Sequence, residues 1–274
     1  MPNEKMIAHI REAGIAQGPK KREDRERLLR EFGFRTKDRA EYALIASCFN
    51  PYLEPNDMIA FRHLLDRFEV DYSLLPKEYC CGDPFFLHAI NTGSPSELEG
   101  AKALAAEFFA ENLRQVRHLG ASKIILYCAG CDMVFDAFKA DVPEEILWYP
   151  TLFARLFRGG KLDLEADYYP GCHRNRRAGR ATPLDLEAVS RILDRIEGLE
   201  LNPLSTDLCC MKAEELPTLA AGIRSRTVIT PCSGCSMFLR QALKEKKGSR
   251  VFLLSEVLLA AVTGRPLREP EAPA

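Results

Sequence analysis

Residues 123–131 read KIILYCAGC, and residues 227–235 read TVITPCSGC. Each stretch begins with a short run of apolar and β-branched residues, which is typical of a buried strand, and ends in a Cys-x-x-Cys pair. In open α/β sheets, binding sites form beyond the carboxyl ends of the strands. Helical patterns follow both pairs, and the N–H groups at a helix N-terminus favour negative charge such as that of thiolate ligands. The two stretches therefore predict two cysteine sites, each at the edge of an α/β sheet.

The ten cysteines repeat one order twice: a single cysteine, an adjacent pair and then Cys-x-x-Cys. The first set is Cys48, Cys80, Cys81, Cys128 and Cys131, and the second set is Cys172, Cys209, Cys210, Cys232 and Cys235. Similar strand-like runs also precede the single cysteines, YALIAS before Cys48 and DYYPG before Cys172. No cysteine is left over, so the sequence indicates a duplication of one cysteine-rich half.

The segments between these runs carry helical patterns. Apolar residues recur at helical spacing in 55–69, 97–118, 144–157, 183–196, 212–223 and 253–263. We expect Asn56 or Asp57 to cap the first of these helices, Trp148 and Phe153 to lie in the core, and His88 to be packed in a helix. Strands that alternate with helices predict an α/β fold of two homologous halves. Each half is expected to be a Rossmann-like, mainly parallel sheet flanked by helices, with the cysteines at the carboxyl ends of strands.

The chain divides into four expected regions. These are a charged helical N-terminal extension at 1–40, a first half at 41–160, a second half at 161–266 and a disordered tail at 267–274. We expect the extension to be either a solvated helix or an arm that docks a partner protein.

Composition excludes several classes of protein. A net charge of −1 is unlike the strongly basic face that nucleic-acid binding requires. The chain starts without an apolar run of signal-peptide length, and no stretch has the roughly 18 apolar residues of a membrane span. We therefore expect a cytoplasmic protein without a membrane span. Disulfides are rare in that compartment, and clustered cysteines there more often bind metal or carry out redox chemistry.

Spacing alone leaves several cysteine chemistries open. A structural zinc ion takes four ligands, whereas each set offers five cysteines. A thioredoxin-like Cys-x-x-Cys would leave six cysteines unexplained. A cubane iron–sulfur cluster uses four cysteines and would leave one spare in each half.

The doubled pattern Cys…Cys-Cys-Gly…Cys-x-x-Cys resembles the cysteine-rich CCG domain family, over about residues 42–264, and within it the B-type component of heterodisulfide reductases. The resemblance implies a non-cubane [4Fe–4S] cluster on each cysteine set, in which one of five thiolates bridges two irons. It further implies that a disulfide substrate is cleaved between the two clusters, with Cys81 and Cys210 as catalytic cysteines. Electrons would come from partners that resemble the ferredoxin-like C-type component and the flavin-containing A-type component of these reductases.

Two other functions remain open beside this one. The first is an electron-relay protein of a larger complex, linked to quinone or to another reductase, without a substrate site of its own. The second is a zinc-stabilised assembly protein without a redox role.

The second set departs from the family pattern. The first set reads Cys80-Cys81-Gly82, whereas the second reads Cys209-Cys210-Met211, and the stretch that follows it is shorter. Glycine allows a close approach and an unusual φ that methionine does not. For the second site we therefore rank a non-cubane cluster first, a cubane cluster second and zinc third.

Basic residues follow Cys172. The segment 172–180 holds His173 and four arginines, of which Arg174, Arg176 and Arg177 are candidates to capture an anionic substrate or carrier. Compensation of cluster charge, partner docking and a solvated loop are the alternatives. His173 is expected either to protonate a departing thiolate or to donate a hydrogen bond near the cluster.

Overall fold

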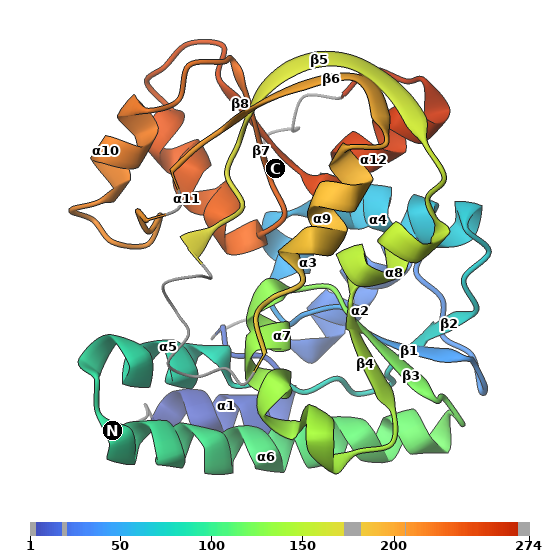
Figure 1. Ribbon diagram of the computed structural model, residues 1–274. Helices are drawn as coiled ribbons and strands as arrows, with labels where there is room; N and C mark the ends of the chain where they lie inside the picture. Colours follow the sequence, from blue (N-terminus) through green and yellow to red (C-terminus); the bar gives the residue numbers. More distant parts are fainter. Residues whose placement is uncertain (1–3, 18–20, 173–181, 206, 268–274) are drawn as a thin grey trace. The chain divides into compact units, whose positions relative to one another are not determined.

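The computed structural model describes residues 4–17, 21–172, 182–205 and 207–267 (Figure 1). The chain forms two compact units. The first unit comprises Met1–Leu53, Glu69–Tyr149 and Arg176–Leu184. The second unit comprises Glu54–Phe68, Pro150–Asn175 and Asp185–Ala274. Each unit is built around its own sheet.

The sheet of the first unit has four parallel strands in the order β2-β1-β3-β4. The strands are β1 (Tyr42–Ile45), β2 (Tyr72–Leu74), β3 (Lys123–Leu126) and β4 (Glu145–Trp148). The sheet of the second unit has four parallel strands in the order β6-β5-β7-β8. Its strands are β5 (Gly160–Tyr168), β6 (Ile196–Pro203), β7 (Thr227–Thr230) and β8 (Arg250–Leu253). Both sheets follow one topology, which confirms the expected α/β fold of two Rossmann-like halves.

The helices of the first unit come largely from the first half of the sequence. They are α1 (Glu4–Ala13), α2 (Arg22–Glu31), α3 (Asn50–Leu53), α5 (Asp83–Thr92), α6 (Pro95–His118), α7 (Ala129–Phe135) and the 3₁₀ helix η1 (Asp136–Asp141). The second unit contains α4 (Pro55–Arg67), α8 (Tyr149–Leu156), α9 (Leu186–Leu193), α10 (Leu216–Ala221), α11 (Ser233–Leu243) and α12 (Leu254–Thr263). The first residue of α8, Tyr149, is still counted in the first unit.

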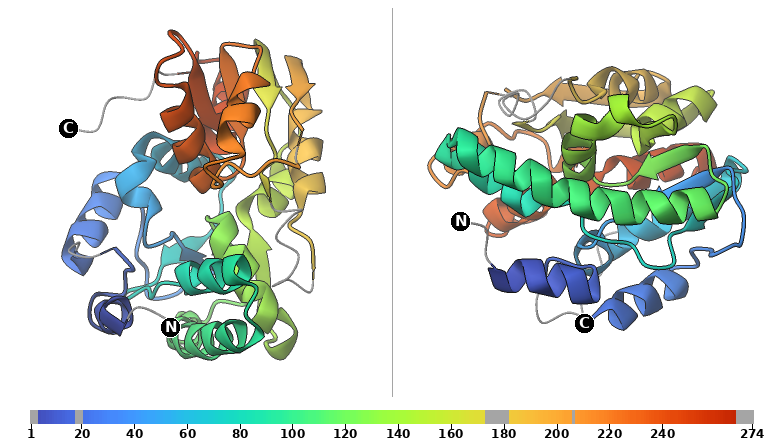
Figure 2. Two further views of the ribbon diagram at one scale, coloured as in Figure 1. Left: turned by 90° about the vertical axis from the view of Figure 1, so that its left-hand side faces the viewer. Right: turned by 90° about the horizontal axis from the view of Figure 1, so that it is seen from below.

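Alternating strand residues place the core of the first unit. Ala43 and Ile45 of β1, with Ile124 and Leu126 of β3, share one face because side chains alternate along a strand. Apolar side chains of α1, α5, α6 and α7 cover this face. The long helix α6 lies beside α5 (Figure 2). Glu107 of α6 forms an ion pair with Arg11 of α1. Helices α1 and α6 therefore pack in the same apolar cluster. The segment that carries Cys80 and Cys81 contributes both cysteines to this cluster.

The second unit has a comparable core. Val228 of β7 and Val251 of β8 pack with apolar residues of α10 and α11 on one face of the sheet. Helix α12 packs against β5, β7 and β8 and also against α4. On α4, the Phe61 ring lies 5.6 Å from the Phe153 ring of α8, centroid to centroid. Helix α4 therefore completes the core of the second unit, although it comes from the first half of the sequence.

The structure corrects three local expectations. The predicted helix 144–157 is strand β4 followed by α8, because Glu145–Trp148 pair in register with β3. Helix α4 begins at Pro55 after Glu54, so neither Asn56 nor Asp57 caps it; proline at the first position already has a helical φ. His88 is exposed rather than packed, because the buried face of α5 is formed by other positions. The expected burial of Trp148 and Phe153 is confirmed.

Candidate functional site

The single cysteines and the Cys-x-x-Cys pairs follow neighbouring strands. Cys48 comes shortly after β1 and Cys128 shortly after β3, and Ile45 stands opposite Leu126 in the parallel pairing of these strands. In the second unit, Cys172 follows β5 and Cys232 follows β7, which are also parallel neighbours. The carboxyl ends of parallel neighbours meet at one edge, so each sheet brings its cysteines to a common edge.

Thiol contacts join all five cysteines of the first set. Cys48 adjoins Cys80, Cys80 adjoins Cys81, and Cys131 adjoins both Cys81 and Cys128. Cys80, Cys81 and Cys131 are buried, whereas Cys48 and Cys128 are half-buried. The first set is thus one continuous chain of sulfur contacts.

The second set is joined in the same way. Cys209 Sγ lies 3.0 Å from Cys172 Sγ. Cys210 bonds with Cys172, Cys209 and Cys235, and Cys235 also bonds with Cys232. Cys232 is half-buried and the other four are buried. All ten cysteines are free thiols. The structure brings them together in the same two groups of five that the sequence pattern indicates.

The thiols contact one another rather than surround a common point. Among the described residues, no group of three or more His, Cys, Asp or Glu side chains is arranged to hold a metal ion. The chemistry of the donor set nevertheless fits an iron–sulfur group, because soft thiolates are the ligands of iron–sulfur clusters. Several thiolates can exist together in such a place only with a cation among them, since burial and the negative charge of neighbouring thiolates disfavour ionisation.

Protonation differs along the first set. The pKa of Cys48 is raised well above its usual range, first by the hydrogen bond that it donates to Cys80 and then by burial. The pKa of Cys131 is also raised, by its bonds with Cys128 and Cys81 and by burial. Cys81 is the exception: hydrogen bonds from Cys131 and Cys80 lower its pKa. Negative charge on the first set is therefore most stable on Cys81.

Helix N-termini stand at both Cys-x-x-Cys pairs. Cys128 occupies the N-cap position of α7, and Cys232 occupies that of α11. Cys131 and Cys235 lie in the first turns of these helices, where N–H groups and the helix dipole favour negative charge. This arrangement was expected from the sequence, and it gives both sites the same electrostatic support.

Left-handed backbone marks the first site at two positions. Gly82 has φ 91°, and a Cβ atom added there would lie 3.3 Å from Ala105 Cβ of α6. Ser47, just before Cys48, has φ 79°, and Gly171 before Cys172 has φ 92°. Ser47 gives no sequence signal for this conformation, whereas a glycine, as at positions 82 and 171, does.

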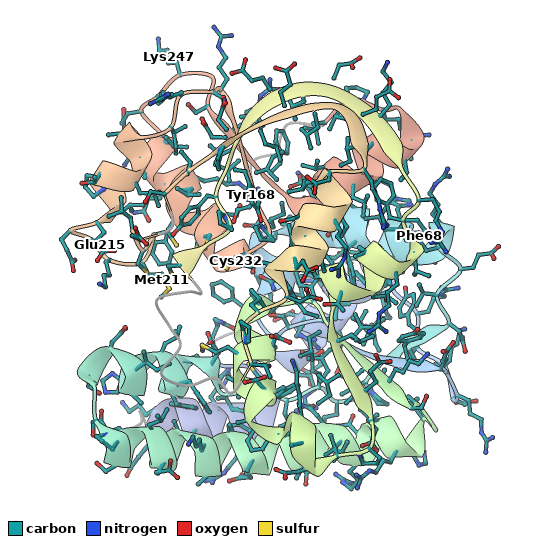
Figure 3. All side chains as sticks on the ribbon, in the orientation of Figure 1. Phe68, Tyr168, Met211, Glu215, Cys232 and Lys247 are labelled. Carbon is teal, nitrogen blue, oxygen red and sulfur yellow. The ribbon has the colours of Figure 1, made fainter. Side chains whose placement is uncertain are left out.

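The backbone at Met211 explains why the second set does not need the glycine of the family pattern. Its φ is not among the positive values of the described residues, so the position does not require glycine. The residue Met211 is 38% exposed. Its side chain is labelled in Figure 3. Glu215 follows, and its Oε2 accepts a hydrogen bond from Cys209 N at 2.5 Å. The loop after Cys210 therefore uses a carboxylate where the first site uses a left-handed turn.

Charged residues outside the cysteine sets also hold the first site. Arg25 Nη2 lies 2.6 Å from Glu78 Oε2, and Arg25 Nε donates to Ser47 O at 3.0 Å. Sequence reasoning missed this pair, because Arg25 stands in a run of charged residues that resembles a solvated helix.

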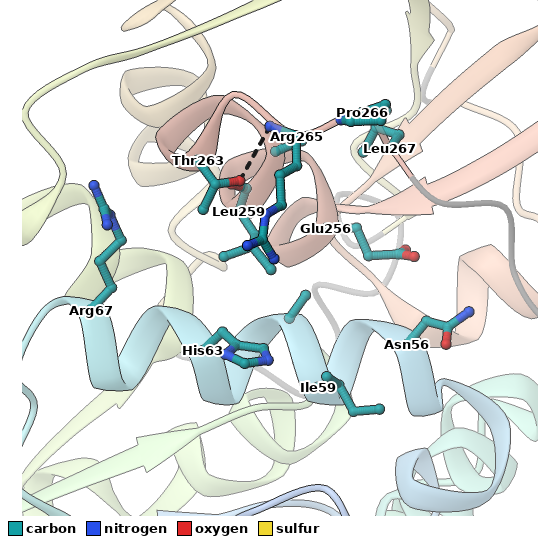
Figure 4. Close-up of a pocket in the computed structure, with 12 residues that line it drawn as sticks. Asn56, Ile59, His63, Arg67, Glu256, Leu259, Thr263, Arg265, Pro266 and Leu267 are labelled. Carbon is teal, nitrogen blue, oxygen red and sulfur yellow. Dashed lines mark hydrogen bonds between the residues drawn. The ribbon is translucent and has the colours of Figure 1, made fainter.

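Some expected residues and features lie elsewhere. His173, Arg174, Arg176 and Arg177 fall outside the described residues. A cavity of about 580 Å³ opens between α4 and the end of α12 in the second unit (Figure 4). None of the ten cysteines lines it. In the part of the chain that the structure describes, no helix is both long and apolar enough to cross a membrane.

Comparison with known proteins identifies a domain match and several relatives. The cysteine-rich domain CCG matches residues 42–136. Two similar proteins are the D subunits of the dihydromethanophenazine:CoB–CoM heterodisulfide reductases of Methanosarcina acetivorans and Methanosarcina mazei. The first is 26% identical over 161 residues, which cover 53% of this chain and 37% of the relative. The second is 25% identical over 216 residues, which cover 70% of this chain and 49% of the relative.

The chain thus spans about half the length of these relatives, or less. The matched range 42–136 contains the complete first set of cysteines. The relatives are D subunits, whereas the sequence pattern resembles the B-type component of the same class of reductase. The region that holds the first cysteine set therefore matches the cysteine-rich CCG domain, and the chain is similar to heterodisulfide reductase subunits.

Proposed function

We propose that the chain is an iron–sulfur subunit of a heterodisulfide reductase-like complex, which reduces, or in reverse oxidises, a disulfide/thiol substrate. The observation that carries this proposal is the convergence of five free thiols at the carboxyl edge of each parallel sheet. The match to the CCG domain and the similarity to heterodisulfide reductase subunits support the same class of chemistry. Oxidoreductase activity on sulfur groups would then require the assembled complex.

Each cysteine set would hold one [4Fe–4S] cluster. Five thiols favour the non-cubane form over a cubane, which needs four. Cys81, which adjoins two other thiols, would be a central ligand of the first set. Cys210, which adjoins three other cysteines, would take the corresponding place in the second set. Each cluster would supply one electron when bound.

The protein's own side chains would bind and orient the substrate and shield the clusters from water. Reduction of a disulfide consumes two electrons and two protons and yields two thiols. Buried cysteines keep water from most of each ligand set, and the N-termini of α7 and α11 stabilise negative charge there. His173 is proposed as a proton donor to a departing thiolate, and Arg174, Arg176 and Arg177 as partners of an anionic substrate. Electrons would come from ferredoxin-like and flavin-containing partner proteins in the cytoplasm.

Metal analysis and spectroscopy of protein kept from oxygen test the proposal. We expect about eight irons per chain with matching acid-labile sulfide, as two four-iron clusters require. Zinc in place of iron would contradict it and favour an assembly protein. A paramagnetic signal that changes on addition of a thiol supports a substrate site. Iron without any thiol-dependent signal would instead indicate an electron relay.

Reciprocal variants assign the ligands. Cys81→Ser is expected to abolish the signal of the first cluster and leave the second, and Cys210→Ser is expected to do the opposite. Each variant serves as the control for the other, because both remove one buried thiol from equivalent positions. Loss of both signals in either variant would mean that the two sets do not act as independent sites.

A further inference from the structure

Two helices precede the region that matches the CCG domain. Helices α1 and α2 end before residue 42, where the match begins. Ile10 of α1 is fully buried in the same apolar cluster as Cys80 and Cys81. The N-terminal segment, defined here as residues 4–31 with the exception of 18–20, is therefore packed into the core that surrounds the first cysteine set.

The turn after α1 docks on the loop that carries the adjacent cysteines. Cys80 N donates a hydrogen bond to Gly14 O at 2.7 Å. Gly14 has φ 75°, and a Cβ atom added to it would lie 2.4 Å from Glu78 O. Only glycine combines this conformation with so close an approach of two backbones.

The same turn lies beside a sulfur of the set. Ala16, two residues after Gly14, adjoins the half-buried Cys48. Ala16 belongs to the same apolar cluster and is 7% exposed, and Cys48 packs against that cluster, so the turn shields Cys48 from bulk water. Solvent exposure is one of the means by which proteins set the potential of iron–sulfur clusters.

Arg25 of α2 ties together the loops on both sides of the set. Its guanidinium contacts Glu78 at 2.6 Å and donates to Ser47 O at 3.0 Å. Glu78 Oε2 also accepts from Ala46 N at 2.8 Å. The side chains of Arg25 and Glu78 are 4% and 2% exposed. The loop before Cys48 and the loop before Cys80 are thus fixed through one buried charge pair.

The second set is held differently. Its adjacent pair is bonded from within its own loop, through Glu215 Oε2 to Cys209 N, and from the end of β5, where Tyr169 Oη donates to Leu208 O at 2.7 Å. Both contacts come from residues near the second set in the sequence or in its own sheet. The two otherwise similar sites therefore differ in what surrounds them.

We propose that the N-terminal segment is a working part of the first cysteine site, in which Arg25 and the turn at Gly14 position the loops that carry Cys48 and Cys80. The inference rests on the proposed function only where it concerns cluster potential. Its consequence is that the two clusters are unequal, with the potential of the first dependent on residues that precede the CCG domain. Loosening of the segment admits more water to the first cluster, and because solvent exposure is one of the determinants of an iron–sulfur potential, the potential of the first cluster shifts.

The first test uses the protein without metal and follows the alkylation of each cysteine by iodoacetamide with mass spectrometry. Arg25→Gln removes the charge and both contacts, and Arg25→Lys keeps the charge but cannot reproduce the fork. We expect Cys48 to react about tenfold faster in Arg25→Gln, with Arg25→Lys between it and the wild type, because the loops open more readily. Cys232, equally half-buried in the second set, is expected to keep its rate.

The matched control is Arg27→Gln. Arg27 lies on the same helix, but its ion pairs with Asp24 and Glu31 are exposed. This variant is expected to leave the reactivity of Cys48 unchanged. Equal rates at Cys48 in the wild type, Arg25→Gln and Arg27→Gln would overturn the proposal.

A second pair of variants applies if Arg25→Gln does not fold. Gly14→Ala introduces a side chain against Glu78 O, whereas Gly120→Ala meets no atom within 4 Å. Both replace a glycine with positive φ, at 75° and 66° respectively, so they share the backbone penalty. Only Gly14→Ala is expected to accelerate the labelling of Cys48. Equal labelling in these two variants would also overturn the proposal.

The second test measures the midpoint potentials of both clusters after anaerobic reconstitution. Arg25→Lys is expected to shift the potential of the first cluster, identified by its absence in Cys81→Ser, and to leave the second unchanged. Equal shifts of both potentials, or no shift, would contradict a specific role for the segment. If no cluster forms in the wild type, the proposed function fails, while the labelling result still decides the role of the N-terminal segment.

Discussion

Arg240 Nη1 of α11 lies 2.5 Å from Glu54 Oε2, although the two residues are 186 positions apart in the sequence. The Glu54 side chain is 2% exposed and that of Arg240 is 29% exposed. This ion pair joins the start of α4 to α11 within the second unit. It is one of the contacts through which a helix from the first half of the sequence becomes part of the second unit.

We expect Glu54→Ala to destabilise the protein by about 2 kcal/mol, because it removes the carboxylate at Arg240 Nη1 and leaves this partly buried guanidinium with only Val251 O and a distant Glu256. Urea unfolding measures the change in the free energy of unfolding. Glu187→Ala is the matched control, since it removes an exposed ion pair of α9 with Arg191 and should cost less than about 0.5 kcal/mol. Similar losses in the two variants would show that the Glu54 pair behaves like a surface pair.

Glu256 makes stability depend on pH. Burial, and next the nearby charge of Asp57, raise its pKa from 4.5 to about 8, while Arg240 lowers it and Glu54 raises it. Between these two values the folded state binds a proton that the unfolded state has lost, so the contribution of Glu256 to stability falls as pH rises. Each unit of pKa difference corresponds to about 1.4 kcal/mol.

We therefore expect Glu256→Gln to gain stability relative to the wild type as pH rises from about 4.5 to 8, by a few kcal/mol in all. Above the upper value the difference should become constant. Denaturant unfolding of both proteins across this range measures it. A difference that does not change with pH would show that Glu256 is ionised in the folded protein throughout.

Asn112 of α6 holds the loop before the adjacent cysteines of the first set. Its Oδ1 accepts from Tyr79 N at 2.8 Å, and its Nδ2 donates to Tyr79 O at 2.9 Å. Asn112 is 1% exposed, so Asn112→Leu leaves both backbone groups of Tyr79 unpaired. We expect a loss of about 2 kcal/mol in the free energy of unfolding.

Gln115 provides the control on the same helix. It bonds N and O of Lys77 in the same two-point manner, each at 2.8 Å, but at an exposed position where water can replace it. Gln115→Leu should cost well under half as much as Asn112→Leu. Equal costs would mean that burial is not what makes the Asn112 bonds matter.

Gly82→Ala tests the left-handed turn after Cys81. The residue has φ 91°, so alanine there costs about 1–2 kcal/mol in backbone strain, in addition to close contact with Ala105. We expect weaker iron retention by the first cysteine set, measured as iron per chain after gel filtration. Met211→Gly changes the corresponding position of the second set without relieving strain, so iron there should be unaffected.

The cysteine pattern was sufficient to predict much of the architecture. The strands before Cys48, Cys128, Cys172 and Cys232 are apolar runs that end at a cysteine, and the structure has all four. By contrast, β2, β4, β6 and β8 were not predicted as strands. Some are very short, as Tyr72–Leu74 is, and Glu145–Trp148 also fits a helical spacing with the helix that follows it.

The rest depends on contacts between distant segments. Arg25 stands among charged residues, and only its partner Glu78, far along the chain, marks it as buried. The left-handed Ser47 is not a glycine, so its conformation depends on the loop contacts around it. The metal ligands and the region boundaries at residues 40, 160 and 266 stay predictions, because sulfur contacts alone do not identify a bound group.

The membership of α4 in the second unit has a practical consequence for how this protein can be divided. A fragment that begins at residue 161 would lack α4, the helix against which α12 packs, and would also lack α8. It would present an uncovered apolar helix face to solvent and should aggregate on expression. Neither cysteine-rich half can therefore be exchanged as a separate module. A chimera of two related proteins would need residues 54–68 and the C-terminal half from the same parent.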